Sequence, residues 1–115
     1  MPRRDLRVTL LEMVEAADRA RWIVENHTLE ELYSDWESAY ALRLALQIVG
    51  EAASRVPPET RDQHPTIPWD QIIGLRHVLV HGYDAVDLDI LWQIASRDVL
   101  LLLAKLRELL GLDEP

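Results

Sequence analysis

The sequence has no cysteine and no phenylalanine, and Lys105 is its only lysine among 115 residues. Without cysteine there is no disulfide, no thiolate zinc site, no iron–sulfur cluster and no cysteine nucleophile. The longest uninterrupted apolar run, Val99–Ala104, has six residues, whereas a membrane span needs ~18 to 20. The N-terminal residues carry no signal-peptide apolar core. We therefore expect a cytoplasmic protein without a membrane contact.

Acidic residues outnumber basic ones, with 20 Asp and Glu against 12 Lys and Arg, which gives a formal net charge of −8. Such a surface repels polyphosphates at long range, so the composition argues against non-specific coating of nucleic-acid duplexes. Eleven of the 12 basic residues are arginine, the side chain that binds phosphate or carboxylate with two parallel hydrogen bonds. Local anion sites therefore remain possible.

Apolar residues recur at alternating steps of three and four in three long segments, which predicts one buried stripe on each of three helices. The stripes are Leu6, Leu10, Met13, Ala17, Ala20 and Val24; Ala39, Leu42, Leu46, Val49, Ala53 and Val56; and Leu88, Trp92, Ala95, Val99, Leu102, Leu106 and Leu109.

Two segments, 28–31 and 34–37, match the capping box, in which a hydroxyl and a carboxylate satisfy free amides of a first helical turn. The first predicts a short connecting helix that begins after Thr28. The second predicts that the long second helix begins after Ser34.

Prolines and glycines mark the other boundaries. The segment 57–68 holds four prolines and is predicted to be a stiff polar loop that ends the second helix. A third helix is expected to run from its last proline to Gly82. Asp84 and Asp87 are candidate caps for the last helix, and Gly111 is expected to end that helix in the left-handed conformation.

The chain has no strand pattern, no repeat and no composition break, so we expect one domain over residues 1–115. Its fold class is predicted to be all-α, an up-and-down four-helix bundle with a short extra helix. The run Val99–Ala104 is apolar all round the helix, and one side of it would face water unless a second chain covered it. This favours a dimer.

Candidate chemistry is concentrated at the end of the third helix. The sequence has no glycine-rich phosphate loop, no Gly-x-Ser-x-Gly elbow and no His-Glu-x-x-His pair. Instead Arg76, His77, His81 and Tyr83 lie within eight positions. All four side chains are suited to acid–base or anion-binding chemistry.

Two interpretations of this segment need no phosphate chemistry. In one, both histidines are ordinary residues near a helix C-terminus, where a protonated imidazole is favoured by the helix dipole. In the other, His77 and His81 bind a metal ion, because residues four apart lie about 40° from each other around a helix. A third ligand would then come from Asp84, Asp87 or His64.

The remaining interpretation is metal-free cleavage of RNA by Arg76 and His81. RNA supplies its own nucleophile, the 2′-hydroxyl, while a histidine moves the proton and an arginine stabilises the charge on the phosphorane. A spacing of five residues places the two side chains about 140° apart on a regular helix. Two copies of the chain would solve this problem by forming a shared groove with two arginines and two histidines.

The pattern Arg76-x4-His81-x-Tyr83 resembles the Arg-x(4–6)-His signature of HEPN ribonuclease domains. More narrowly, it resembles the form found in HepT toxins of the HepT/MntA toxin–antitoxin systems. The resemblance extends over about residues 5 to 110. Its flanking segments are Val49–Ala52, Pro65–Trp69, Val86–Asp87 and Leu91–Trp92.

This resemblance implies a dimeric helical bundle in which two motifs form a composite cleft. It implies an endoribonuclease that needs no metal and no cofactor and leaves a 2′,3′-cyclic phosphate. Arg76 would bind the phosphate and stabilise the transition state, and His81 would transfer the proton. The implied partner is an MntA-like nucleotidyltransferase antitoxin that transfers AMP to Tyr83, so that the modified cleft excludes RNA.

The sequence departs from the family at His77, where Asn or Asp is common, so His77 is expected to be auxiliary. Glu51 is a candidate ion-pair partner for Arg76. The four tryptophans are interpreted as packing anchors. The alternative function is a non-catalytic helical subunit that binds or scaffolds a nucleotidyltransferase.

Overall fold

The computed structural model describes residues 5–81 and 87–112, and within these ranges it contains helices and no strand. The elements are α1 (Leu6–Asn26), α2 (Leu29–Ser34), α3 (Trp36–Ser54), α4 (Pro58–Gln63), α5 (Trp69–His81), α6 (Leu88–Gln93), the π-helical segment η2 (Ile94–Asp98) and α7 (Val99–Leu110). The predicted all-α fold is confirmed.

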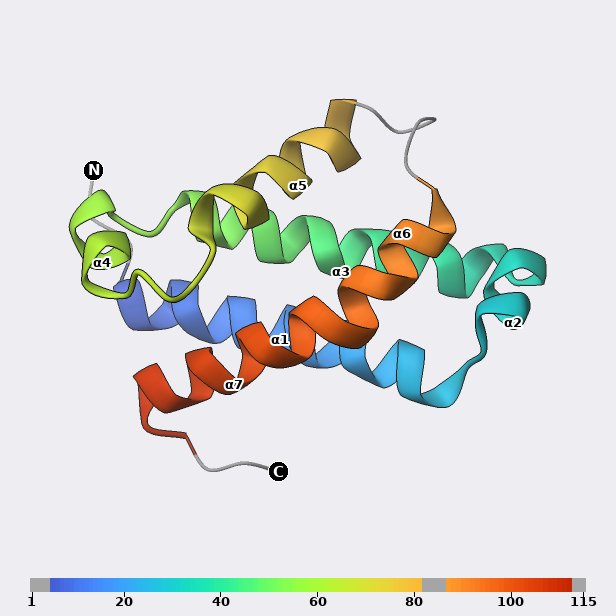
Figure 1. Ribbon diagram of the computed structural model, residues 1–115, viewed down its shortest axis with the longest axis horizontal. Coiled ribbons are helices and arrows are strands. Elements are labelled where there is room, and N and C mark those ends of the chain that lie inside the picture. Colours follow the sequence, from blue (N-terminus) through green and yellow to red (C-terminus); the bar gives the residue numbers. More distant parts are fainter. Residues whose placement is uncertain (1–4, 82–86, 113–115) are drawn as a thin grey trace.

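The long helices run up and down next to one another, as Figure 1 shows. Helix α3 packs against both α1 and α5, and α7 packs against α1. The C-terminal end of α5 projects away from α3 (Figure 1), so the end of the third main helix is the part least enclosed by the bundle.

The three predicted stripes form the core. Residues from the middle of each stripe are almost completely buried, with Met13, Leu46 and Leu106 all at 0% exposure. The outermost positions Leu6 and Leu109 are partly buried and pack against this core. Burial of aliphatic side chains on one face of each helix therefore holds the bundle together.

The cap of the short helix α2 is the one that the sequence predicts. The Thr28 hydroxyl accepts a hydrogen bond from the Glu31 amide, and the Glu31 carboxylate accepts one from the Thr28 amide. At the last helix Asp87 caps α6, with its side chain accepting from the Asp89 amide. Gly111 ends α7 in the left-handed conformation with φ at 70°.

The predicted start of α3 is wrong by one residue. Asp35, and not Ser34, caps this helix, and its carboxylate accepts from both the amide and the hydroxyl of Ser38. Ser34 is instead the last residue of α2, and its hydroxyl donates to the Glu31 carbonyl. A carboxylate that accepts two hydrogen bonds displaces the neighbouring hydroxyl as the cap.

Two further segments differ from the sequence prediction. The expected polar loop 57–68 contains a helical turn, α4, which begins with Pro58 at its first position. Proline favours that position because its fixed φ suits a helix and its missing amide would be unpaired there. The expected continuous last helix is interrupted by η2, so it consists of α6, η2 and α7. Each such π-helical turn accommodates a wider hydrogen-bonding ring.

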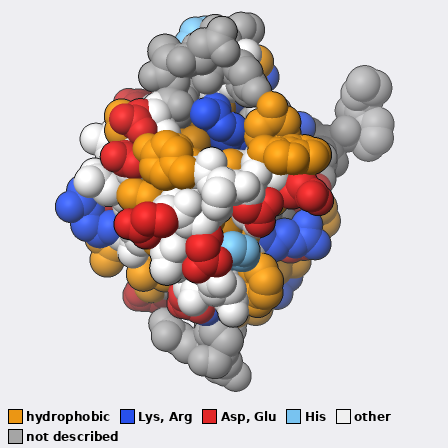
Figure 2. Space-filling model, turned by 90° about the vertical axis from the view of Figure 1, so that its right-hand side faces the viewer, with side chains coloured by type: hydrophobic (Ala, Val, Ile, Leu, Met, Phe, Trp, Pro, Cys, Tyr) orange, Lys and Arg blue, Asp and Glu red, His pale blue; other side chains and the backbone are white. Residues whose placement is uncertain are grey.

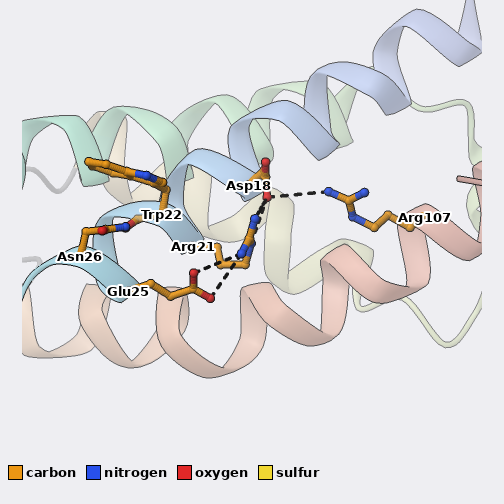
Figure 3. A network of polar contacts seen from close by, with 6 residues as sticks. All are labelled: Asp18, Arg21, Trp22, Glu25, Asn26 and Arg107. Atoms are coloured by element: carbon orange, nitrogen blue, oxygen red, sulfur yellow. Dashed lines mark hydrogen bonds and ion pairs between the residues drawn. The ribbon is translucent and has the colours of Figure 1, made fainter. Parts of the chain in front are cut away.

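Charged side chains join α1 to α7 at the surface (Figure 3). The Asp18 carboxylate is paired with Arg21 of its own helix and lies 3.7 Å from the Arg107 guanidinium of α7. Arg21 also pairs with Glu25 at 3.1 Å. Asp18 thus bridges two cations from different helices.

The prediction that all four tryptophans are packing anchors is wrong for two of them. Trp69 is buried and Trp92 packs partly buried against the core, but Trp22 and Trp36 are 58% and 68% exposed. Neither exposed residue lies on a predicted stripe. None of the helices in the described ranges is long and apolar enough to cross a membrane.

Candidate active site on helix α5

Helix α5 carries the motif residues and is anchored to the bundle. The helix follows Pro68, whose carbonyl accepts from the Ile72 amide at 3.1 Å. The Trp69 indole Nε1 donates to the His64 carbonyl at 3.0 Å, and Trp69 is only 6% exposed. Leu79 is also buried, at 5%. Buried side chains in both halves of α5 therefore hold the helix against the bundle.

Arg76 lies where α5 meets α3. Its side chain is half-buried, and its Nε atom is buried without a hydrogen-bond partner among the residues that the structure describes. A buried, unsatisfied guanidinium nitrogen is unfavourable, because the group has lost water without gaining an acceptor. The guanidinium has been partly desolvated at this position, a condition that strengthens its attraction for an anion.

Gly50 of α3 is the residue that Arg76 meets. A Cβ atom placed on Gly50 would lie 2.3 Å from the Arg76 Cβ and 2.9 Å from the Ile72 carbonyl oxygen. The two helices can approach this closely only because position 50 has no side chain. In the sequence Gly50 belongs to a segment that carries the family resemblance, but no role is predicted for it. A glycine in the middle of a predicted helix was the available signal.

The expected ion pair between Glu51 and Arg76 does not form in the structure. Glu51 is half-buried, and its Oε1 accepts a hydrogen bond from Gln47 Nε2 of the same helix at 3.0 Å. Adjacent positions on a helix point in directions about 100° apart, so Gly50 faces Arg76 and Glu51 does not. The side chain of His77 is exposed.

His81 is the last residue of α5. Its side chain lies outside the described part of the chain, as do Gly82, Tyr83 and Asp84. The regular helix from Arg76 to His81 keeps the two residues about 140° apart around the axis. The angular mismatch expected from the sequence therefore persists in the structure.

A hollow of about 250 Å³ lies between α3 and α5 beside the motif. It is lined by Tyr40, Arg43, Leu44, Gln47 and Leu79. The first four come from α3 at spacings of three, one and three, so they lie near one face of that helix. Sequence reasoning missed Arg43 and Gln47, because the sequence does not show which polar residues of α3 face α5.

Larger hollows are also present, and a hollow of about 380 Å³ between α3, α5 and α7 is lined in part by Ile72 and Leu75 of α5. One of about 510 Å³ between α1 and α3 is lined mostly by apolar side chains, with Glu12, Glu15 and Arg19 among the others. Carboxylates at this hollow would repel phosphate. We take the 250 Å³ hollow as the candidate site, because Arg43 lines it together with Leu79, three residues after Arg76 on α5.

The metal interpretation gains no support from the described residues. They contain no group of three or more His, Asp or Glu side chains arranged to hold a metal ion. Of the three residues considered as a third ligand, Asp87 caps α6, His64 follows the end of α4 as its C-cap, and Asp84 lies outside the described residues.

The molecular surface near α2 is of mixed character. Figure 2 shows this end of the molecule, where hydrophobic and acidic side chains lie next to each other. Exposed aromatic residues here include Tyr33, Trp36 and Tyr40, and the first turns of α2 and α3 carry Glu30, Glu31 and Glu37.

Comparison with known proteins decides the family. A family model described as "Ribonuclease HepT-like" matches residues 13–109, which include the whole of α5 and most of the bundle. The chain belongs to the HepT-like ribonuclease family. The all-α fold is thus that of a HepT-like protein.

Curated HepT-like relatives cover nearly the same length. A protein of Methanocaldococcus jannaschii named "Putative RNase" is 31% identical over 99 residues, 86% of this chain and 91% of its own. A "Probable ribonuclease HepT" of Thermococcus cleftensis is 30% identical over 100 residues, 87% of this chain and 91% of its own. A third relative, from Caldanaerobacter subterraneus, is 31% identical over 87 residues. No solved structure matches the chain.

Proposed function

We propose that this HepT-like protein is a metal-independent endoribonuclease that acts as the toxin of a toxin–antitoxin pair. The family match over residues 13–109, which contain Arg76, His81 and Tyr83, carries the proposal. The names of the relatives from M. jannaschii and T. cleftensis, which describe ribonucleases, support it.

The reaction uses the 2′-hydroxyl of the RNA as nucleophile. His81 accepts the proton of that hydroxyl as its oxygen bonds to the adjacent phosphorus. The bond from phosphorus to the 5′-oxygen breaks, the leaving oxygen takes up a proton, and a 2′,3′-cyclic phosphate remains. Arg76 stabilises the additional negative charge on the phosphorane. Its partly desolvated guanidinium supports this role, because charge–charge attraction increases where water is excluded.

A second copy of the chain completes the site in this proposal. Arg76 and His81 of one chain diverge by about 140°, so each cleavage centre takes one residue from each protomer. The contact face is the one beside α5, where Tyr40 and Leu44 are 54% and 55% exposed. Burying such apolar side chains against a second copy supplies the driving force for association.

The proposed partner is a nucleotidyltransferase antitoxin of the MntA kind. It transfers AMP from a nucleoside triphosphate to the Tyr83 hydroxyl, with release of pyrophosphate. The added phosphodiester places negative charge two residues from His81 and repels the RNA backbone. His77 is auxiliary, and the enzyme takes no cofactor.

The decisive experiment measures cleavage of RNA by Arg76→Ala and His81→Ala, with His77→Ala as the control on the same helix. The first two variants should lose about two orders of magnitude or more in rate, as removal of an acid–base or charge-stabilising group does. The His77 variant should stay within about tenfold of the parent. Circular dichroism of each variant verifies the fold.

Cleavage in EDTA tests metal independence. The rate should be unchanged, and the products should carry cyclic-phosphate ends. If chelation abolishes cleavage and zinc or manganese restores it, His77 and His81 become metal ligands and the proposed mechanism is wrong. If all motif variants cleave like the parent, the non-catalytic binding subunit replaces the ribonuclease.

Subunit mixing tests the composite site. Arg76→Ala and His81→Ala chains should regain activity when mixed, because one of the two centres in a mixed dimer is complete. Leu44→Glu should give a monomer in sedimentation and lose cleavage, because Leu44 is exposed on the proposed contact face. A fully active monomer would refute the composite site.

Tyr83→Phe separates cleavage from neutralisation. This variant should cleave RNA at the parent rate but accept no AMP from the antitoxin. In cells it should be toxic in the presence of that antitoxin. Survival of those cells would show that neutralisation does not depend on modification of Tyr83.

A further inference from the structure

Gly50 is a buried residue of α3 that lies against Arg76 and Ile72 of α5. A Cβ atom at this position would lie 2.3 Å from the Arg76 Cβ, 2.9 Å from the Ile72 carbonyl oxygen and 3.0 Å from the Arg76 Cα. Contacts under 3.0 Å are essentially never made by real Cβ atoms. Any side chain at position 50 must therefore change the spacing of the two helices.

The atoms that meet Gly50 cannot move independently of α5. One is the backbone carbonyl of Ile72, which in an α-helix accepts from the amide four residues later, that of Arg76. The others are the Cα and the first side-chain carbon of Arg76, whose positions are set by the backbone. A methyl group on residue 50 thus pushes the helix itself, by about 1 Å before the shortest contact reaches the ordinary range above 3.4 Å.

We propose that Gly50 is a positioning residue for RNA cleavage, because its missing side chain sets the place of the Arg76 guanidinium relative to the scissile phosphate. This inference rests on the proposed ribonuclease function. A displacement of about 1 Å at a charge-stabilising group can cost about two orders of magnitude in rate. Gly50 touches neither the RNA nor the reacting atoms.

The chain offers a matched control in Gly74, two residues before Arg76 on α5. A Cβ atom on Gly74 would meet nothing within 4 Å, and this residue is exposed. Gly50→Ala and Gly74→Ala both replace a glycine inside a helix with the residue of highest helix propensity. They differ in that only the first adds an atom between α3 and α5.

The experiment measures two quantities for each variant: the single-turnover rate on an RNA oligonucleotide, and the affinity for the same oligonucleotide with 2′-O-methyl groups, which cannot be cleaved. Gly74→Ala should match the parent in both. Gly50→Ala should lose about tenfold to a hundredfold in rate, with affinity within about threefold, because the transition-state contact suffers more than ground-state binding.

A double-mutant cycle tests whether Gly50 acts through Arg76. Once Arg76→Ala has removed the guanidinium, adding Gly50→Ala should lower the rate by less than about threefold. An equal loss in both backgrounds would refute the positioning role, as would a Gly50→Ala enzyme as fast as Gly74→Ala. If Arg76→Ala itself cleaves like the parent, the proposed function fails, so the two failures are distinguishable.

Stability is measured alongside, because Gly50→Ala strains the core. Circular dichroism at 222 nm and the melting temperature are compared with those of the parent, and rates are taken well below the transition. Combining Gly50→Ala with Gly74→Ala adds helix propensity to α5 and gives a second background. If neither Gly50→Ala nor the double variant with Gly74→Ala folds, Gly50 is required for the whole fold and the proposal is overturned.

Discussion

Leu101 and Leu102 are adjacent leucines of α7 with opposite environments, and their truncation gives a sharp test of the fold. Leu102 is 5% exposed and Leu101 is 63% exposed. Both lie in the apolar run Val99–Ala104, but only Leu102 is on the predicted buried stripe of the last helix. The structure predicts that Leu102→Ala destabilises the protein strongly and that Leu101→Ala does not.

The magnitudes follow from burial. Leu102→Ala removes nearly all contacts of a buried side chain and leaves a cavity, which costs about 3 kcal/mol. Only about a third of Leu101 is buried. Because the loss of free energy scales with the buried apolar area, Leu101→Ala should cost less than about 1 kcal/mol. Against a total stability of roughly 5–15 kcal/mol, the first loss should lower the melting temperature by about 10 °C.

Urea unfolding followed by circular dichroism at 222 nm gives the free energy of unfolding of each variant. The measurement is made at two protein concentrations, because a side chain covered by a second copy contributes a concentration-dependent amount. Equal losses for the two variants at both concentrations would show that Leu101 is buried within the chain. The orientation of α7 about its own axis would then differ from the one described above.

Two predictions concern pH. The hydrogen bond from the Tyr33 hydroxyl to Asp89 raises the pKa of Tyr33 to about 12. The parent should therefore be more stable than Tyr33→Phe below pH 10, and this advantage should disappear between pH 10 and about 12. Hydrogen bonds from Ser38 lower the pKa of Asp35 below 3.8, so the advantage over Asp35→Ala should be present above that pH and disappear as the pH falls further.

Difference measurements isolate these two groups, since all other titrating residues are common to parent and variant. Urea midpoints are recorded at each pH for both pairs. If the difference in urea midpoint between the parent and Tyr33→Phe stays constant up to pH 12, the Tyr33 hydroxyl does not donate to Asp89. A difference for Asp35 that does not change in acid would exclude the carboxylate as the cap of α3.

Features that depend on neighbours in the chain were predictable. The capping box at Thr28 and Glu31 is confirmed because both hydrogen bonds join residues three apart. The buried stripes are confirmed because the helical period alone decides which residues share a face. Even a local signal becomes ambiguous where two capping residues are adjacent, as the shift from Ser34 to Asp35 at the start of α3 shows.

The sequence predicts that Arg76 and His81 share a helix, but not what surrounds Arg76. Arg76 and His81 lie on one helix, as their spacing within an apolar pattern predicts. The sequence could not show that Glu51 bonds to Gln47, or that the Arg76 Nε atom is buried without a partner among the described residues. Which residue of α3 faces Arg76 depends on the rotation of α3 about its axis, and the sequence does not give that rotation.

The sequence by itself determined the helical class, the buried faces of the long helices and the identity of the motif residues, because these follow from composition, local hydrogen bonding and the helical period. Tertiary structure alone decided which helices approach one another. It also decided that Gly50 meets Arg76, two residues 26 positions apart. Contacts between distant segments depend on the packing of whole helices, which no short stretch of sequence encodes.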